Sequence, residues 1–195
     1  MKYNYTVLLS LITFIVLSGC VATHQQIIKL KSIFDEKQAL EMLEQGNNKI
    51  IGSALIRQSG GGVVTCAGIE VILYPATEYA KERIKYIYGS IEKAYRDYNQ
   101  PQQRYLIQKR GDRLGAIETI PEIVFEPDYE FYHFCTRKSI GDAQGNFEFD
   151  KLKDGEYFIF TTITWNVYQL GTQGGTLMLK VKVKDGETKK IVLAP

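Results

Sequence analysis

The sequence predicts a mainly β fold, a sandwich of short strands with one helical insertion and one N-terminal helix, and three observations lead to this prediction. Apolar and polar residues alternate over residues 50–57 and 177–184, which is typical of strands with one buried face. Clusters of Gly, Asp and Asn separate the short runs, as turns do in sandwiches. Residues 77–98 instead place apolar side chains three and four positions apart, as an amphipathic helix does.

The composition fits one globular domain and argues against several classes of function. The chain has 195 residues, and 24 Lys and Arg against 22 Asp and Glu leave a formal net charge of +2. So small a charge gives no electrostatic reason to expect a nucleic-acid partner. Two His and three Cys are too few for a His-rich or Cys-rich metal site. We therefore expect no nucleic acid, no metal and no cofactor.

Residues 1–19 have the organisation of a secretory signal peptide. A start with one positive charge, Lys2, precedes an almost unbroken apolar run over residues 6–17. Twelve helical residues reach only about 18 Å, well short of a hydrocarbon core of about 30 Å. A permanent membrane span is therefore the weaker interpretation.

The run Leu17-Ser18-Gly19-Cys20 resembles the lipobox of bacterial lipoproteins. The resemblance implies that Cys20 carries diacylglycerol, becomes the mature N-terminus and anchors the chain in a membrane through two or three acyl chains, palmitate among them. The alternative is a chance cysteine in an ordinary signal peptide or a short anchor helix. Val21 stands where such proteins often carry the Asp that retains them in the inner membrane. We expect the outer membrane, with the protein facing the periplasm.

The elements of the mature chain follow in order from a lipidated tether at residues 20–31 and an N-terminal helical segment at residues 32–48. Ser32 and Asp35 have the spacing of a capping box. One face of the expected helix, residues 33–45, carries Ile33, Phe34, Leu40 and Leu43. Strands are expected at residues 49–57, 63–68, 69–74, 104–108, 120–125, 129–137, 147–149, 156–165, 176–184 and 188–193.

Glycine residues predict a possible helix break and two turns between the expected elements. Gly89 lies at the centre of the 77–98 helix, which leaves a break or two shorter helices open. Gly174-Gly175 is expected to be a flexible turn, and Asp185-Gly186 to join the last two strands as a hairpin.

The spacing Phe147-x-Phe149-x-x-Leu152-x-x-Gly155-x-Tyr157, preceded by Asp142-x-x-Gly145, resembles the carboxypeptidase regulatory-like domain. That family folds as a seven-stranded sandwich of the transthyretin (prealbumin) type. The resemblance covers residues 50–75 and 130–193 of a domain expected at 49–195, and it departs in an insertion at 76–129. It implies a structural or ligand-binding accessory and supplies no catalytic residues.

Cys66 and Cys135 are the cysteines that remain after lipidation, and the oxidising envelope favours a disulfide bond between them. The alternatives are free buried thiols or a metal site that includes His133. His133 is also the one plausible imidazole for acid or base catalysis, although a histidine within a strand is more often structural.

Aromatic residues supply the candidate ligand surface. Trp165 and Tyr168 precede a glycine-rich stretch, and such side chains combine a rigid apolar area with a polar tip. The insertion adds Tyr79, Tyr86, Tyr88, Tyr95, Tyr98 and Tyr105. The alternative for these tyrosines is that they pack the helix against the sandwich.

The leading functional hypothesis is a non-catalytic lipoprotein that binds or scaffolds proteins of the cell envelope. The alternative is a carbohydrate-binding or peptidoglycan-binding lipoprotein that uses Trp165 and Tyr168. An enzyme ranks third, because it would depend on His133 alone.

Overall fold

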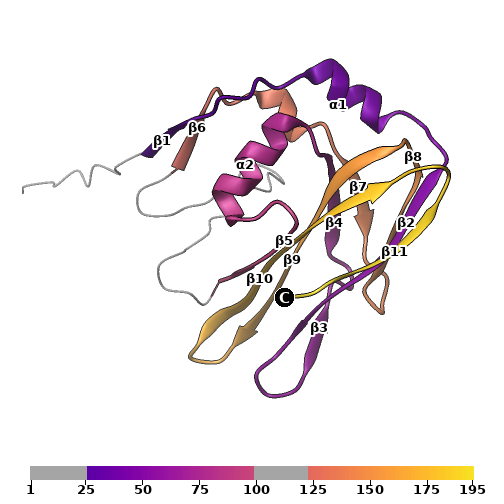
Figure 1. The fold of residues 1–195 in the computed structure, drawn as a ribbon. Helices are drawn as coiled ribbons and strands as arrows, with labels where there is room; N and C mark the ends of the chain where they lie inside the picture. Colours follow the sequence, from indigo (N-terminus) through magenta and orange to yellow (C-terminus); the bar gives the residue numbers. More distant parts are fainter. Residues whose placement is uncertain (1–25, 99–122) are drawn as a thin grey trace, which may run out of the picture.

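The computed structural model describes residues 26–98 and 123–195, and the fold of these residues is mainly β, as expected (Figure 1). The signal peptide, Cys20 and the strand expected at 104–108 lie outside the described residues. Across the described ranges, no helix combines the length and the apolar character that a membrane crossing requires. The elements are β1 (Gln26–Lys29), α1 (Glu36–Leu43), β2 (Asn48–Arg57), β3 (Val63–Thr65), β4 (Glu70–Pro75), α2 (Glu78–Tyr88), β5 (Lys93–Asp97), β6 (Ile123–Glu126), the 3₁₀ helix η1 (Glu130–His133), β7 (Arg137–Ile140), β8 (Asn146–Leu152), β9 (Gly155–Val167), β10 (Gly171–Val183) and β11 (Thr188–Leu193).

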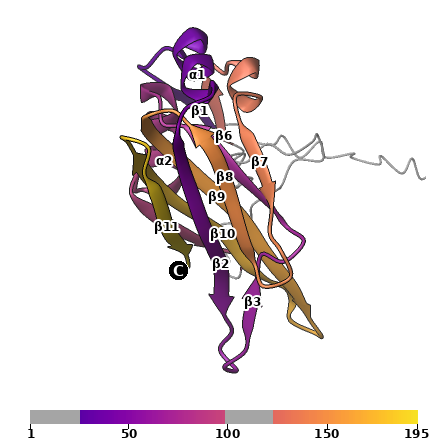
Figure 2. The same cartoon turned by 90° about the vertical axis from the view of Figure 1, so that its right-hand side faces the viewer.

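Two sheets face each other and enclose the first core (Figures 1 and 2). One sheet has the order β5-β10-β9-β4-β7, and in the other β2 pairs with β11, β3 and β8. These facing sheets use nine strands, where the resemblance implied seven. Alternate residues of β9, Tyr157, Ile159 and Ile163, point into the space between the sheets, as the period of two predicts.

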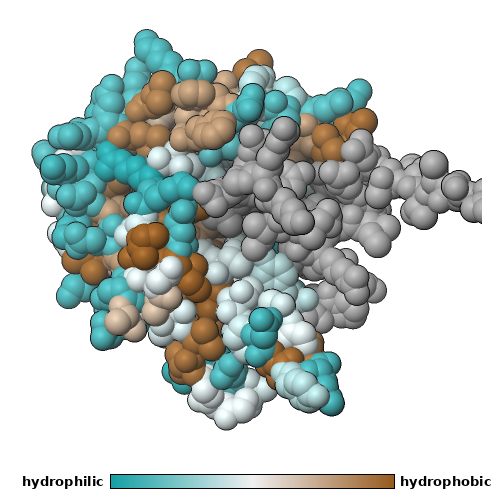
Figure 3. Space-filling view, turned by 180° about the vertical axis from the view of Figure 1, so that it is seen from behind, coloured by the Kyte–Doolittle hydropathy of each residue, from teal (hydrophilic) through white to brown (hydrophobic). Residues whose placement is uncertain are grey.

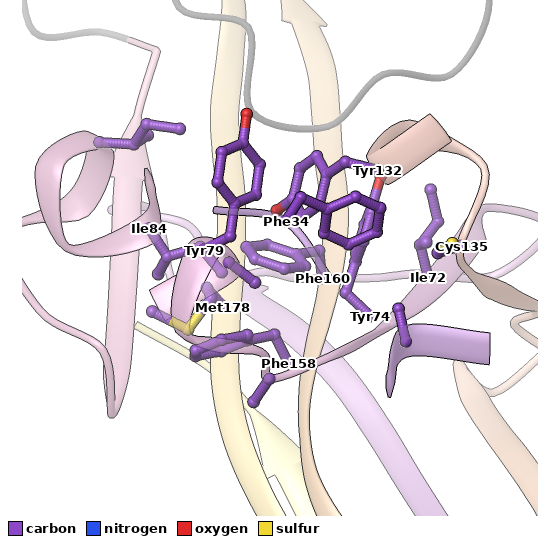
Figure 4. Packing of buried hydrophobic residues seen from close by; sticks show 14 of the residues in the cluster. Phe34, Ile72, Tyr74, Tyr79, Ile84, Tyr132, Cys135, Phe158, Phe160 and Met178 are labelled. Carbon is purple, nitrogen blue, oxygen red and sulfur yellow. The ribbon is translucent and has the colours of Figure 1, made fainter. Parts of the chain in front are cut away.

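A second core lies on the outer face of the five-stranded sheet. Phe158 and Phe160 of β9 and Tyr74 of β4 pack there against Tyr79 of α2 and Tyr132 of η1 (Figure 4). Because both of its faces are buried, β4 is apolar almost throughout rather than alternating. The helical insertion is therefore a third layer on the sandwich.

The N-terminal segment is more firmly built into the fold than the tether prediction allowed. Strand β1 pairs in parallel with β6, so residues from Gln26 onward belong to the domain. Helix α1 begins after Asp35, whose carboxylate accepts the Gln38 N–H at 2.9 Å. Asp35 and not Ser32 is thus the cap, and Ile33 is 76% exposed instead of facing the core.

The 77–98 segment divides at Gly89. This residue ends α2 in a left-handed conformation with φ of +71°, which glycine adopts without strain. The chain then forms β5, which pairs with β10. A continuous helix over 77–98 is wrong; the break that Gly89 left open is present, and a strand, not a second helix, follows it.

The strand expected at 129–137 is also wrong. Tyr132 and Cys135 are buried while Phe131 and Phe134 are exposed, a spacing of three that suits a 3₁₀ turn. Regular β pairing resumes only at Arg137, where β7 begins.

The last two strands do not form the predicted hairpin. Strand β11 crosses to the other sheet and pairs in parallel with β2, from Thr188 opposite Lys49 to Leu193 opposite Ala54. The buried Asn48 side chain accepts the Glu187 N–H at 3.0 Å and fixes the start of this crossing. Pairing with β2 also buries Leu193 in the inter-sheet core.

Gly174-Gly175 lies inside β10 and is not a turn. A side chain at Gly175 would collide with the backbone oxygen of Arg96 on β5, so glycine permits the close approach of these strands. Gly174 has φ of +101° and would place a Cβ against Ile163.

Candidate functional site

The long β9–β10 hairpin carries the predicted ligand residues to one end of the molecule. Its strands pair without a break in register from Gly155 opposite Val183 to Val167 opposite Gly171. The hairpin projects from the end opposite α1, beside the β2–β3 hairpin, in both ribbon views (Figures 1 and 2). Tyr168, Gln169 and Leu170 form its turn, which the Leu170 N–H closes by donating to Val167 O at 3.1 Å.

The hairpin tip, residues 164–173, exposes an aromatic ring beside polar groups. Tyr168 is 89% exposed and Leu170 is 71% exposed. Trp165 is half-buried because its ring packs against the edge of the inter-sheet core. A Cβ on Gly174 would lie only 2.9 Å from the Trp165 ring, so this glycine makes room for the indole. The structure thus brings the two predicted aromatic residues to one tip.

The polar groups of the tip were not predicted as ligand residues. Thr172 Oγ1 donates to Asn166 Oδ1 at 3.0 Å, and Gln173 Nε2 donates to Leu170 O at 3.3 Å. The first bond joins a hydroxyl and an amide across paired strands, and the second holds the Gln173 amide against the turn. The period of two in β9 already placed Asn166 on the opposite face from Trp165, but only the β10 register identifies Thr172 as its neighbour.

The insertion tyrosines mostly pack against the sheet. Tyr79 is fully buried, and Tyr88 and Tyr95 are partly buried against the two cores. Tyr86 is 44% exposed, with its ring 5.7 Å from that of Phe125. Tyr105 lies outside the described residues. These contacts favour the packing interpretation for Tyr79, Tyr88 and Tyr95.

A buried ion pair holds α2 to the segment before η1. The Arg83 side chain is 4% exposed, and Nη1 donates to Asp128 Oδ1 at 2.6 Å and to the Tyr79 hydroxyl at 3.0 Å. The Tyr79 hydroxyl in turn donates to Pro127 O at 2.8 Å. The guanidinium lies 4.4 Å from the centre of the Phe125 ring, where a cation–π contact adds to the pairing.

His133 belongs to this same ion-pair cluster. Its Nε2 lies 3.2 Å from Asp128 Oδ1, and Nδ1 has no hydrogen-bond partner among the residues that the structure describes. Burial alone would raise the pKa of Asp128, but the hydrogen bond with His133 and the charge of Arg83 lower it to about 2. The arrangement holds an ionised carboxylate between the Arg83 guanidinium and the His133 imidazole, and these contacts suit a structural role.

The disulfide predicted between Cys66 and Cys135 is absent, and both described cysteines are free. Cys66 lies in the inter-sheet core, where Sγ donates to Gly145 O at 3.2 Å, whereas Cys135 lies in the outer core. The two thiols are thus on opposite faces of the five-stranded sheet. Burial raises the pKa of Cys66, and burial with the Glu36 charge raises the pKa of Cys135 to about 11. Neither thiol is an activated nucleophile.

A polar cavity of about 510 Å³ opens among the loops at the other end of the sandwich. Its Asp154 is already engaged, since Oδ1 accepts hydrogen bonds from Asn48 Nδ2 at 2.9 Å and from Asp185 N at 3.2 Å. Within the described ranges, no three His, Cys, Asp or Glu gather as metal ligands would. The cavity lining is Gln45, Gly46, Asn47, Lys153, Asp154, Asp185 and Gly186, which includes no aromatic residue.

The geometry defines a mainly β sandwich with an exposed aromatic hairpin tip. No protein-family model matches the sequence, and no curated protein sequence matches it. A crystal structure described as a "putative carbohydrate binding protein" from Pseudomonas aeruginosa has a similar fold, with a TM-score of 0.58. The match covers 83% of this chain and 97% of that chain at 23% sequence identity, so it establishes likeness of fold alone.

Proposed function

We propose that this chain is a non-catalytic saccharide-binding lipoprotein of the cell envelope and that the β9–β10 hairpin tip contacts the ligand. The observation that carries the proposal is the exposure of Tyr168, at 89%, on a tip that also presents Trp165. An aromatic ring this exposed contributes little to the fold. It offers a flat apolar surface to a ligand instead.

The chemistry of the tip suits a sugar. The carbon-bound hydrogens of a pyranose ring form an apolar face that packs on an aromatic ring, while its hydroxyls need donors and acceptors. Asn166, Thr172 and Gln173 supply amide and hydroxyl groups on the same hairpin tip. The similar fold of the Pseudomonas aeruginosa protein, described as carbohydrate binding, supports the same choice.

An envelope protein is the second candidate ligand. Leu170, at 71% exposure, adds an aliphatic side chain to the tip, and exposed aromatic and aliphatic groups together are typical of protein contacts. A sugar gains less from an exposed leucine than a protein does. A Leu170→Ser variant therefore separates the two candidates, because it weakens protein binding and leaves saccharide binding nearly unchanged.

The proposal that the protein is non-catalytic rests on the burial of His133 and its contact with Asp128. The His133 side chain is 5% exposed and contacts Asp128 within the Arg83 cluster, away from the hairpin tip. A general base needs access to a substrate proton, which this burial denies.

The envelope location rests on the Leu17-Ser18-Gly19-Cys20 run and on Val21. In this proposal Cys20 carries the lipid, and the protein faces the periplasm from the outer membrane. A Cys20→Ser variant should then move from the membrane fraction to the soluble fraction. Continued membrane attachment of a processed form would contradict the anchor.

The direct test is sedimentation of the purified full-length protein with purified peptidoglycan and with other insoluble envelope glycans. We expect wild-type protein to sediment with at least one of them and Tyr168→Ala to weaken that binding roughly tenfold, as loss of an aromatic anchor does. Tyr86→Ala removes a tyrosine that is 44% exposed on α2 and serves as the matched control. Equal retention of all three proteins, or retention of none, would contradict the saccharide proposal.

A further inference from the structure

The end of the molecule opposite the hairpin tip carries a second exposed apolar surface. Ile33 is 76% exposed, Phe134 is 62% exposed, Leu40 is 46% exposed and Phe131 is 39% exposed. Ile33 precedes α1, Leu40 lies in α1, Phe131 lies in η1 and Phe134 follows η1; we call these four residues the apolar end surface. Figure 3 shows brown and tan side chains over this end of the molecule, between hydrophilic ones. An apolar cluster of this kind marks a contact surface.

The elements that carry the apolar end surface are fixed against one another. The Phe34 ring lies 5.6 Å from the Tyr132 ring, which joins the start of α1 to η1. Arg137 Nη2 donates to Leu43 O at 2.6 Å and joins the end of α1 to β7. The surface is therefore a rigid part of the domain.

The N-terminal segment reaches this end along a fixed path. Leu30 N donates to Glu126 O at 2.7 Å, and the Glu82 carboxylate accepts the N–H groups of Lys31 and Ser32 at 2.8 to 3.1 Å. Only five residues, 21–25, lie between Cys20 and Gln26, the first residue of β1, and these six steps along the chain span at most about 20 Å when extended. A lipid on Cys20 would thus hold this end of the domain close to the bilayer.

We propose that the apolar end surface rests on the lipid bilayer and directs the β9–β10 hairpin tip away from it. This inference depends on the proposed lipid anchor and adds an orientation to the proposed function. Both ribbon views place the hairpin tip at the end opposite α1 (Figures 1 and 2). With one end seated on lipid, the tip faces the periplasm, where the glycan lies.

Apolar contact, and not charge, would hold the surface to the bilayer. Two lysines near it lie in ion pairs, with Lys37 Nζ 3.8 Å from Glu41 and Lys153 Nζ 2.6 Å from Glu44. Binding through Ile, Leu and Phe side chains is insensitive to salt and to the headgroup charge of the lipid.

The test uses the lipidated full-length protein in phosphatidylcholine vesicles that contain doxyl-labelled lipid, a quencher confined to the bilayer. Ile33→Cys and Leu40→Cys each receive an environment-sensitive dye, while the native Cys66 and Cys135 are buried. Val63→Cys is the matched control, because Val63 is 49% exposed at the β2–β3 hairpin on the opposite end. We expect about twofold quenching at positions 33 and 40, none at 63, and no change at high salt.

Three results would overturn the inference in distinguishable ways. Protein that fails to float with the vesicles has no lipid anchor, and this result contradicts both the anchor and the proposed orientation. Protein that floats with unquenched dyes at 33 and 40 keeps the anchor but loses the orientation. In a third result, doxyl lipid does not quench the dyes, but the dyes are shielded from an aqueous quencher in native envelopes. This result would indicate that the apolar end surface binds a protein and not the bilayer. Glycan sedimentation remains an independent measurement of the proposed function in each case.

Discussion

Replacement of Arg83 by Met tests whether the buried ion pair holds the third layer on the sandwich. The variant keeps the apolar length over the Phe125 ring but removes the charge that lies 2.6 Å from Asp128 and the donor to the Tyr79 hydroxyl. Loss of one partner of a fully buried pair typically costs about 3–5 kcal/mol. Asp128 is 46% exposed, so water hydrates part of its carboxylate, and we expect the free energy of unfolding to fall by about 2 kcal/mol.

Urea unfolding followed by far-ultraviolet circular dichroism measures this change. A cycle with Asp128→Asn and the double variant isolates the pairwise energy, which we expect to be about 1 kcal/mol or more. Lys37→Met is the matched control, since Lys37 is 87% exposed in a 3.8 Å pair with Glu41 and should alter the unfolding free energy by less than about 0.5 kcal/mol. An Arg83→Met effect as small as this control, or a coupling of zero, would refute the reasoning.

Three further predictions concern the same chain. The Asp128 pKa of about 2 lies below the unfolded value of about 3.9, so its stabilisation is complete above about pH 5 and is lost progressively as the pH falls through 2. Urea unfolding across this range should show a loss that Asp128→Asn reduces. Gly175→Ala should lower the melting temperature by several degrees because its Cβ meets Arg96 O, whereas Gly60→Ala, with open space around it, should not; equal melting curves would contradict the strand contact. Dithiothreitol should leave the melting temperature unchanged, and Cys66 and Cys135 should react with a thiol reagent only after unfolding. A lower melting temperature in dithiothreitol would instead show that the two cysteines are joined by a disulfide bond.

Local patterns predicted the strands best where apolar residues alternate or turns interrupt the chain. Alternation placed residues 49–57 to within a residue of β2, and the Gly-containing turn before residue 156 placed residues 156–165 to within a few residues of β9, whose two faces are both buried. The same logic failed at residues 129–137, where the chain forms a 3₁₀ helix and Tyr132 packs against Tyr79 of α2. Tyr and Phe stand at positions 129, 131, 132 and 134, so the segment fits a spacing of three as well as a spacing of two.

The sequence did not predict which strands pair with each other. The Asp185-Gly186 turn is a normal hairpin sequence, yet β11 pairs with β2, which lies more than 130 residues earlier in the chain. The disulfide prediction failed for a related reason. An even number of cysteines says nothing about which face of a sheet each occupies, and Cys66 and Cys135 occupy opposite faces.

The candidate site was predicted in part. Trp165 and Tyr168 were identified by residue type, and the structure places both on the hairpin tip. Asn166 and Thr172 were missed because their pairing depends on the β9–β10 register, and Leu170 was missed because an isolated leucine in a turn has no distinctive spacing. The apolar end surface joins residues about 100 positions apart, so no local pattern could have revealed it.

Titration of the full-length protein with soluble peptidoglycan fragments, followed by tryptophan fluorescence, tests the central claim most directly. Trp165 is the one tryptophan of the chain, and it lies on the hairpin tip. We predict a saturable change in its emission that Tyr168→Ala weakens and that Tyr86→Ala preserves. An unchanged emission spectrum at every ligand concentration, for fragments that the protein nevertheless retains, would contradict binding at the hairpin tip.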